Sequence, residues 1–331
     1  MGSSTTPAAP DPSAEFLAAF RAAADAQGGM TFAQFMELAL YHPELGYYRR
    51  DRTRVGYARG TDFFTATTSG PIFGELVAAA CVKLLGGRQP GDYTFVEIGA
   101  EPGASVLNGV QHPFAGQRAV QLGEPIELSG RCVVFSNELF DAQPFHRFVF
   151  RRDAWHERGV ALRNNALVEF EIPRTSVAQL PATAPEGYVI DAPVEAAALV
   201  ERIAGQPWSG LFIACDYGKS WRELTEATPG GTGRAYYQHT QSNDLLARPG
   251  EQDLTCHVCW DWLINALAQN RFAAPALESQ ETFFVRHAGE FIAATTAAEA
   301  AQFSRKKLAL MQLLHPAHLG QKFQVLHAWR D

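Results

Sequence analysis

Three short apolar runs constrain the fold of this chain more than any other feature of its sequence. They span residues 93–98, 132–136 and 211–216, and each is followed by a polar or glycine-rich turn. Strands that are apolar along most of their length are typical of a parallel sheet that helices cover on both faces. We therefore expect an α/β fold with such a sheet at its centre.

The pattern around these runs predicts how the chain is divided. Alternating polar and apolar residues indicate an antiparallel β-lobe between the second and third runs. A long polar segment at 217–252 indicates a lid or binding loop, and 277–286 with 322–329 indicates a final strand pair. The expected parts are a disordered leader (1–13), an N-terminal helical region (14–91), a core (92–142 and 186–331) and the inserted β-lobe (143–185).

Charge and composition exclude some classes of protein. The 331 residues carry 28 basic and 35 acidic side chains, a net charge of −7, which argues against a general nucleic-acid binder because such proteins need a basic field. Five cysteines scattered through apolar runs indicate reduced, buried thiols. We find neither a membrane-spanning apolar run nor a signal-peptide pattern, so we expect a cytoplasmic protein that does not enter membranes.

The end of the first apolar run carries the strongest chemical signal. Its pattern is Glu97-Ile98-Gly99-x-x-x-Gly103, and a short helix is expected near 104–110. Glycines at a strand end let the backbone approach a ligand closely, and the helix that follows presents free N–H groups. The pattern fits a nucleotide-like cofactor. An ordinary α/β turn with two glycines is the alternative.

Polar side chains also follow the second and third runs. Asn137, Glu138 and Asp141 come after the second run, and Asp216 ends the third. Ligands of open parallel sheets bind beyond the carboxyl ends of the strands, so these side chains are expected to share one crevice. A helix cap with a solvated turn is the alternative for the group after the second run.

Two further features lie near the end of the long polar segment. His257 is a candidate acid–base or substrate-binding group, although a lone histidine is more often structural. Cys256 and Cys259 have the spacing of half a metal site, but the sequence offers no second cysteine pair. We therefore assign no metal site here.

Taken in order, these segments resemble the MidA-type family of S-adenosylmethionine-dependent methyltransferases, from Met30 to Leu326. The mitochondrial member of this family is an arginine methyltransferase that assists assembly of respiratory complex I. The stretches that are similar to the family's motifs lie at 31–48, 62–65, 71–76, 97–103, 137–142, 216–218, 231–239 and 249–258.

The resemblance implies a Rossmann-like class I methyltransferase sheet with an N-terminal helical part and an inserted lobe. It also implies S-adenosylmethionine as the cofactor and a protein substrate, for which arginine is the precedent. Asn137 and Glu138 would face the transferred methyl group and a cationic or amine acceptor. Glu138, Asp141 or Asp216 would orient the acceptor and take its proton. The implied cofactor-binding residues are Glu97, Gly99, Gly103, Gln121 and Asn137.

Some positions depart from the family pattern at the cofactor site. Glu101 replaces a glycine, and Gln121 stands where an acidic residue usually holds the ribose. The stretch from Gly103 to Val133 is too short for the usual third strand, so we expect a sheet shortened between strands 1 and 4. Two interpretations remain open. The protein is either a methyltransferase with an altered adenosine pocket, or a related fold without cofactor binding that acts as a binding or assembly factor.

Overall fold

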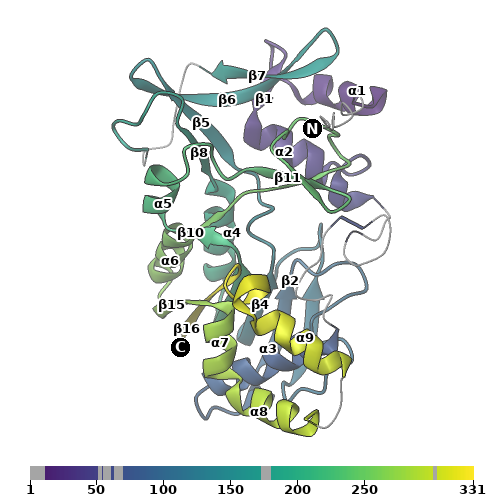
Figure 1. Ribbon diagram of the computed structural model, residues 1–331, viewed down its shortest axis with the longest axis vertical. Helices are drawn as coiled ribbons and strands as arrows, with labels where there is room; N and C mark the ends of the chain where they lie inside the picture. The colour runs from purple at the N-terminus through teal and green to yellow at the C-terminus, as the bar shows by residue number, and fades with distance from the viewer. Residues whose placement is uncertain (1–11, 51–53, 55–60, 63–69, 173–179, 301–303) are drawn as a thin grey trace, which may run out of the picture. The chain divides into compact units, whose positions relative to one another are not determined.

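The computed structural model describes residues 12–50, 54, 61–62, 70–172, 180–300 and 304–331. The chain forms two compact units (Figure 1). The first unit comprises Met1–Phe63, Ala142–Glu195 and Arg222–Cys256, and the second comprises Phe64–Asp141, Ala196–Trp221 and His257–Asp331. The predicted β-lobe thus belongs with the first part of the predicted N-terminal helical region, together with 222–256, which the sequence analysis grouped with the core. The rest of that region, which includes the helix Pro71–Leu84, belongs to the second unit. Most of the predicted leader lies outside the described residues, as do Phe63–Thr65 of the second family motif.

The first unit is built on a five-stranded antiparallel sheet. Its strand order is β1-β6-β5-β8, and β7 pairs with β6 outside this path. The turns between β5 and β6 and between β6 and β7 are Arg152-Asp153 and Asn164-Asn165, all at positive φ. Such two-residue turns match the twist of antiparallel strands. The strands are β1 (Gly29–Thr31), β5 (His146–Arg151), β6 (Ala154–Arg163), β7 (Ala166–Ile172) and β8 (Val189–Ala192).

Two capped helices complete the core of the first unit. Ser13 accepts the N–H of Phe16 at the start of α1 (Ala14–Ala23), and Thr31 forms a capping box with Gln34 at the start of α2 (Phe32–Tyr41). Both helices bury phenylalanines in one cluster. The predicted loop 217–252 contains short elements instead, namely β10 (Gly218–Lys219), α5 (Trp221–Glu226), β11 (Arg234–Tyr237) and β12 (Thr240–Ser242). In the first unit, β11 pairs with β12 and with β13 (Asp253–Thr255).

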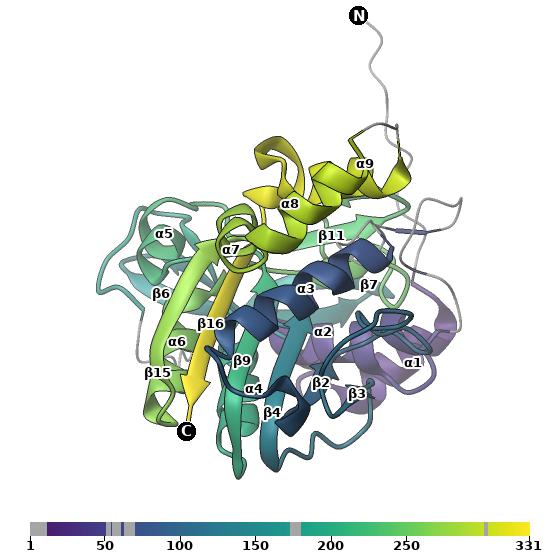
Figure 2. The ribbon, with the colours of Figure 1, turned by 90° about the horizontal axis from the view of Figure 1, so that it is seen from below.

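The second unit holds the predicted parallel sheet, which two antiparallel strands extend (Figure 2). Its order is β15-β16-β9-β4-β2-β3, in which β3, β2, β4 and β9 are parallel and β16 and β15 are antiparallel to their neighbours. This confirms the Rossmann-like class I sheet. The strands are β2 (Thr94–Ile98), β3 (Gly116–Val120), β4 (Gly130–Asn137), β9 (Trp208–Asp216), β15 (Ala273–Ser279) and β16 (Gln324–Arg330), and the two-residue β14 (Val258–Cys259) pairs with β10.

The sheet is shortened where the sequence predicts it. The strand β3 stands at the edge of the six-stranded sheet, in place of the usual third strand. The helix predicted near 104–110 is wrong, because residues 99–115 form turns and bends. Val106 and Leu107 of this stretch are buried against the sheet face that α3 (Pro71–Leu84) also covers. A Cβ atom on Gly74 of α3 would lie 1.9 Å from the carbonyl oxygen of Val106, so the glycine lets the loop reach the helix.

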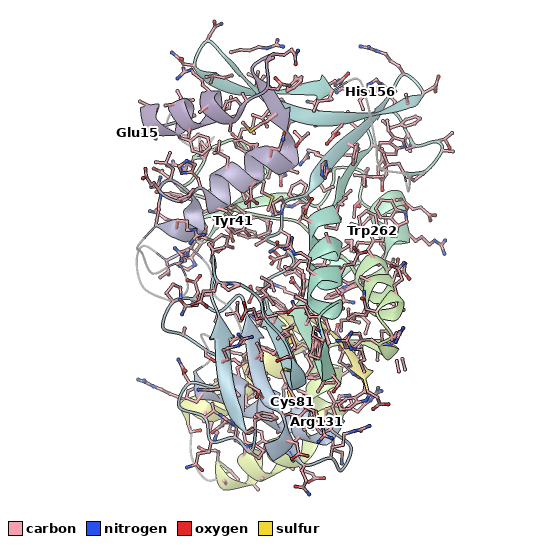
Figure 3. All side chains as sticks on the ribbon, turned by 180° about the vertical axis from the view of Figure 1, so that it is seen from behind. Glu15, Tyr41, Cys81, Arg131, His156 and Trp262 are labelled. Atoms are coloured by element: carbon pink, nitrogen blue, oxygen red, sulfur yellow. The ribbon has the colours of Figure 1, made fainter. Side chains whose placement is uncertain are left out.

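Helices cover both faces of the sheet. Alternate β4 residues point to opposite sides, with Val133 and Phe135 in one buried cluster and Cys132 and Val134 in the other. Figure 2 shows α3 across the first face, and Cys81 of α3 is buried in that core (Figure 3). The first face also carries α7 (Gln280–His287), α8 (Gly289–Ala298) and α9 (Arg305–Leu314), and the second carries α4 (Val194–Ala204) and α6 (Trp260–Gln269).

The C-terminal part corrects one prediction. The strand predicted at 277–286 ends at Ser279, whose side chain accepts the N–H of Thr282 and so begins α7. The predicted pairing of the last two strands is confirmed, since β15 and β16 are antiparallel neighbours. Among the described helices, none is both long and apolar enough to cross a membrane.

Candidate active site

In the second unit, the residues that follow β2 and β4 pack against each other at Gly99. This residue follows β2 with a φ of +87°, and a Cβ atom there would lie 2.8 Å from Cδ1 of Leu139, which follows β4. Gly103, at φ +71°, has no atom within 4 Å of a built Cβ. The turn therefore contains one glycine packed against Leu139 and one glycine, Gly103, at which a side chain would point into open space.

The carboxylate of Glu97 fixes the loop that follows β2. It is 5 % exposed, and its Oε2 accepts the N–H of Val106 at 2.7 Å. Burial raises the pKa of Glu97, while hydrogen bonds from Ser105 and Val106 oppose that shift. The side chain thus closes the loop in the absence of the predicted helix at 104–110.

Gln121 follows the neighbouring strand. Its N–H donates to Oε2 of Glu124 at 2.8 Å, and the preceding residue, Val120, accepts the N–H of Gly99 at 2.9 Å. The structure therefore places Gln121 beside the glycine turn, with a carboxylate three residues further on. The cofactor-binding residues predicted from the sequence all stand at this carboxyl edge of the sheet.

The exit of β4 is held in an unusual backbone conformation. Glu138 has a φ of +52°, and its N–H donates to the carbonyl of Cys215 at 2.9 Å. A left-handed conformation costs a residue with a side chain about 1 kcal/mol or more, and such positions cluster at functional sites. The amide Nδ2 of Asn137 donates to Oε1 of Glu138 at 3.0 Å, so the two side chains form a pair.

Two buried side-chain oxygens at the end of β4 have no hydrogen-bond partner among the described residues. They are Oγ of Ser136 and Oδ1 of Asn137. A buried polar atom left unsatisfied costs free energy, and a bound ligand can supply the missing partner. The sequence analysis did not single out Ser136 as a site residue. Its position directly before Asn137 at a strand exit is the signal that could have found it.

Asp216 at the end of β9 organises the turn after β4. Its Oδ2 accepts the N–H groups of Phe140 at 2.9 Å and of Asp141 at 3.3 Å, and its Oδ1 accepts the N–H of Tyr217 at 2.9 Å. Burial raises its pKa well above 3.8, and the nearby carboxylates of Asp141 and Glu138 add to this rise. The three carboxylates predicted to share one crevice are therefore close together.

His257 lies next to the same strand exit. Its ring is 5.5 Å from that of Tyr217, centre to centre, and Val258 donates its N–H to the carbonyl of Tyr217 at 3.1 Å. Tyr217 lies in the stretch 216–218 that is similar to a family motif, but it was not among the predicted site residues. Cys256 and Cys259 are buried and form no disulfide, and burial raises the pKa of Cys259 to about 12.

Known proteins resemble this chain in sequence and in structure. Residues 114–276 match a family described as "Putative S-adenosyl-L-methionine-dependent methyltransferase". The mitochondrial protein arginine methyltransferase NDUFAF7 of Danio rerio is 24% identical over 298 residues, which cover 72% of this chain and 68% of that protein. Its Caenorhabditis elegans homologue is 24% identical over 329 residues, covering 78% of this chain and 73% of that protein.

A crystal structure from Burkholderia thailandensis, described as a "likely methyl transferase" bound to S-adenosyl-homocysteine, superimposes with a TM-score of 0.83. It is 25% identical, and the match covers 98% of this chain and 95% of that one. A second crystal structure from the same organism has a TM-score of 0.78 at 24% identity. Together, these matches in sequence and structure support a place for the chain among the MidA-type S-adenosylmethionine-dependent methyltransferases.

Proposed function

We propose that this methyltransferase methylates a nitrogen of a cationic or amine side chain, with arginine in a protein as the best candidate acceptor. The observation that best supports this acceptor is the Asn137–Glu138 pair at the end of β4, next to the buried carboxylates of Asp141 and Asp216. A guanidinium nucleophile needs carboxylates that orient it and accept a proton. The arginine methyltransferases among its relatives support the same acceptor.

The residues of the second unit fit a bound S-adenosylmethionine. The empty space on the Cβ side of Gly103 suits a group that approaches the main chain closely, and the unpartnered oxygens of Ser136 and Asn137 suit an ammonium group. We propose that Glu97, Gly99, Gly103, Gln121 and Asn137 form the cofactor site, with Glu97 acting by holding the loop. The cofactor supplies an electrophilic methyl group.

Each polar residue of the crevice has a proposed role. Glu138 receives the proton that the acceptor nitrogen loses as its new N–C bond forms, and Asn137 keeps the Glu138 carboxylate in place through its amide. Asp216 holds the turn that carries Asp141, whose carboxylate adds negative charge for a cationic acceptor. His257, beside Tyr217, is proposed as an auxiliary acid–base group.

A binding or assembly role without cofactor is the second candidate function. It is favoured by the loop 99–115, where turns replace the helix whose N-terminus would otherwise present N–H groups to an anionic ligand. The relevant experiment is calorimetric titration with S-adenosylmethionine and S-adenosylhomocysteine, followed by transfer of a labelled methyl group to arginine-containing peptides. Binding with transfer supports the enzyme, and no binding up to about 1 mM supports the second function.

Substitution of Glu101 by glycine is expected to tighten S-adenosylmethionine binding by about 5-fold. Glu101 lies in the turn between Gly99 and Gly103, so a carboxylate there would oppose the cofactor's own carboxylate, and a charge pair near the surface contributes up to about 1 kcal/mol. The measurement is the dissociation constant by calorimetry. Glu101→Gln is the matched control, because it removes the charge while keeping the side-chain size. Unchanged or weaker binding in both variants would show that Glu101 belongs to the site.

We also propose a cytoplasmic location and a protein partner. All five cysteines are buried and free of disulfides, which suits a reducing compartment. The net charge of −7 favours a cationic protein acceptor over nucleic acid.

A further inference from the structure

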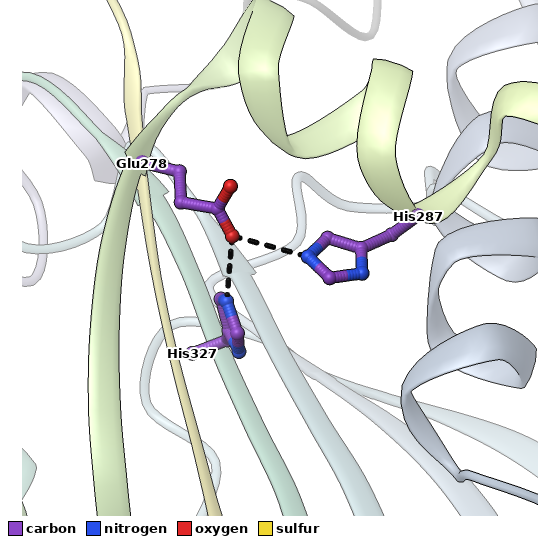
Figure 4. A group of neighbouring side chains, drawn as sticks. All are labelled: Glu278, His287 and His327. Atoms are coloured by element: carbon purple, nitrogen blue, oxygen red, sulfur yellow. Dashed lines mark hydrogen bonds and ion pairs between the residues drawn. The ribbon is translucent and has the colours of Figure 1, made fainter.

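A cluster of two histidines and a glutamate lies on the antiparallel side of the sheet in the second unit (Figure 4). Glu278 comes from β15, His327 from β16 and His287 from the end of α7. No residue of the candidate active site belongs to the cluster. It stands beside the middle of β9, since His327 pairs with Ile213, rather than at the carboxyl ends of the parallel strands.

Strand register and helix length bring the three side chains together. His327 pairs with Ala276, so Glu278 is its diagonal neighbour on the same face of the hairpin. The helix α7 starts directly after β15 and ends at His287, which returns its ring to the strands. Phe283, one turn earlier, packs against both imidazoles, with ring centres 5.1 Å from His287 and 5.6 Å from His327.

The ligand atoms already have the spacing of a metal site. Oε1 of Glu278 lies 3.1 Å from Nε2 of His287 and 3.1 Å from Nε2 of His327, and the three atoms all lie within 4.8 Å of one another. Zinc bonds of about 2.0–2.2 Å in a tetrahedral site place neighbouring ligand atoms roughly 3.3 Å apart. Small side-chain shifts therefore suffice to seat an ion between them.

We propose that Glu278, His287 and His327 form a zinc-binding site. Two imidazoles with one carboxylate suit Zn²⁺, whereas Ca²⁺ and Mg²⁺ prefer oxygen ligands. The side chains of Glu278, His287 and His327 are only 7 %, 14 % and 13 % exposed, so an ion bound by them would be shielded from bulk solvent. The carboxylate offsets part of the charge of the ion.

The hydrogen bonds of the cluster can be replaced by bonds to a zinc ion. Without metal, each Nε2–H donates to Oε1 of Glu278. Zinc binding moves each hydrogen to Nδ1, the alternative position on a neutral imidazole, so Nε2 presents its lone pair to the ion. Arg286 lies 2.9 Å from the other carboxylate oxygen, Oε2, and keeps Oε1 directed toward the histidines.

Zinc titration of the metal-stripped full-length protein tests the proposal. We expect one equivalent of Zn²⁺ to bind, raising the melting temperature, with Mg²⁺ unable to compete. His287→Ala and His327→Ala should each weaken binding by at least about 10-fold. Co²⁺ bound in place of zinc should give a visible absorption spectrum in the wild-type protein that both variants lack.

Two further variants make the result specific. Glu278→Gln keeps the size of the side chain but removes its charge, and it should also lower the zinc affinity even if a histidine variant fails to fold. His156→Ala, on β6 of the first unit (Figure 3), should bind one equivalent like the wild type. A wild-type protein that takes up no Zn²⁺, or equal affinity in all variants, would overturn the site and leave a purely hydrogen-bonded cluster.

Discussion

Replacement of Glu138 by glutamine is expected to lower kcat for methyl transfer by about 100-fold or more. Glutamine keeps the shape of the side chain and can accept the hydrogen bond from Asn137, but it cannot take up the proton that the acceptor nitrogen loses. A positioned general base contributes about 10²–10⁴-fold to a rate. Single-turnover transfer of a labelled methyl group to an arginine peptide measures the effect without interference from product release.

Two controls separate this loss from a loss of binding. S-adenosylmethionine affinity should stay close to that of the wild type in Glu138→Gln, because Asn137 and the glycine turn are intact. Glu201→Gln, which removes an exposed carboxylate on α4, should keep kcat within a few-fold of the wild type. If Glu138→Gln and Asn137→Ala both retain full activity, the assignment of this pair to catalysis is wrong.

Replacement of Asp216 by alanine is expected to lower the free energy of unfolding by about 3–5 kcal/mol. Three backbone N–H groups lose their acceptor. Those of Phe140 and Asp141 are in buried positions, and that of Tyr217 is half-buried. Each unsatisfied buried donor costs about 1–3 kcal/mol, partly relieved by relaxation of the turn. Urea denaturation measures the change. Asp216→Asn should lose less, because its amide oxygen still accepts the first two groups. Equal stability of all three proteins would contradict the role in holding the turn.

The same residue sets the sign of a pH dependence. Burial raises the folded-state pKa of Asp216 above 3.8, so between these two values the folded protein keeps a proton that the unfolded chain releases. The contribution of this residue to stability is thus full below pH 3.8 and is lost as the pH rises through the raised pKa. In that window the wild type should lose stability more steeply than Asp216→Asn. Parallel stability curves would show that the raised pKa makes no such contribution.

The sequence predicted those parts of the fold that local patterns determine. Apolar runs located β2, β4 and β9. The short segment between Gly103 and Val133 indicated that the usual third strand was missing. The helix expected near 104–110 failed because contacts distant in sequence decide that loop. The Glu97 carboxylate and the bare backbone of Gly74 hold Val106 in turns, and neither contact is visible in the local pattern.

In the candidate site, too, local patterns predicted which residues lie together but not how they contact one another. Asn137, Glu138 and Asp216 could be grouped from sequence because carboxyl ends of parallel strands meet at one edge. Their individual geometry could not, since it depends on the positive φ of Glu138 and on which N–H groups reach Asp216. The Glu278 cluster was unpredictable for a related reason. His327 is far from the other two residues in sequence, and the three meet through the register of β15 and β16 and the length of α7.

The missing third strand also affects how the protein behaves in a crowded solution. It makes β3 an outer strand of the sheet as described, with backbone groups on one side that could pair with a strand of another chain. Only five residues long, β3 carries the exposed cationic side chain of Arg118. Short length and charge are two devices that discourage strand-to-strand aggregation. The charge of Arg118 thereby disfavours pairing of β3, the edge strand of the shortened sheet, with a strand of another molecule.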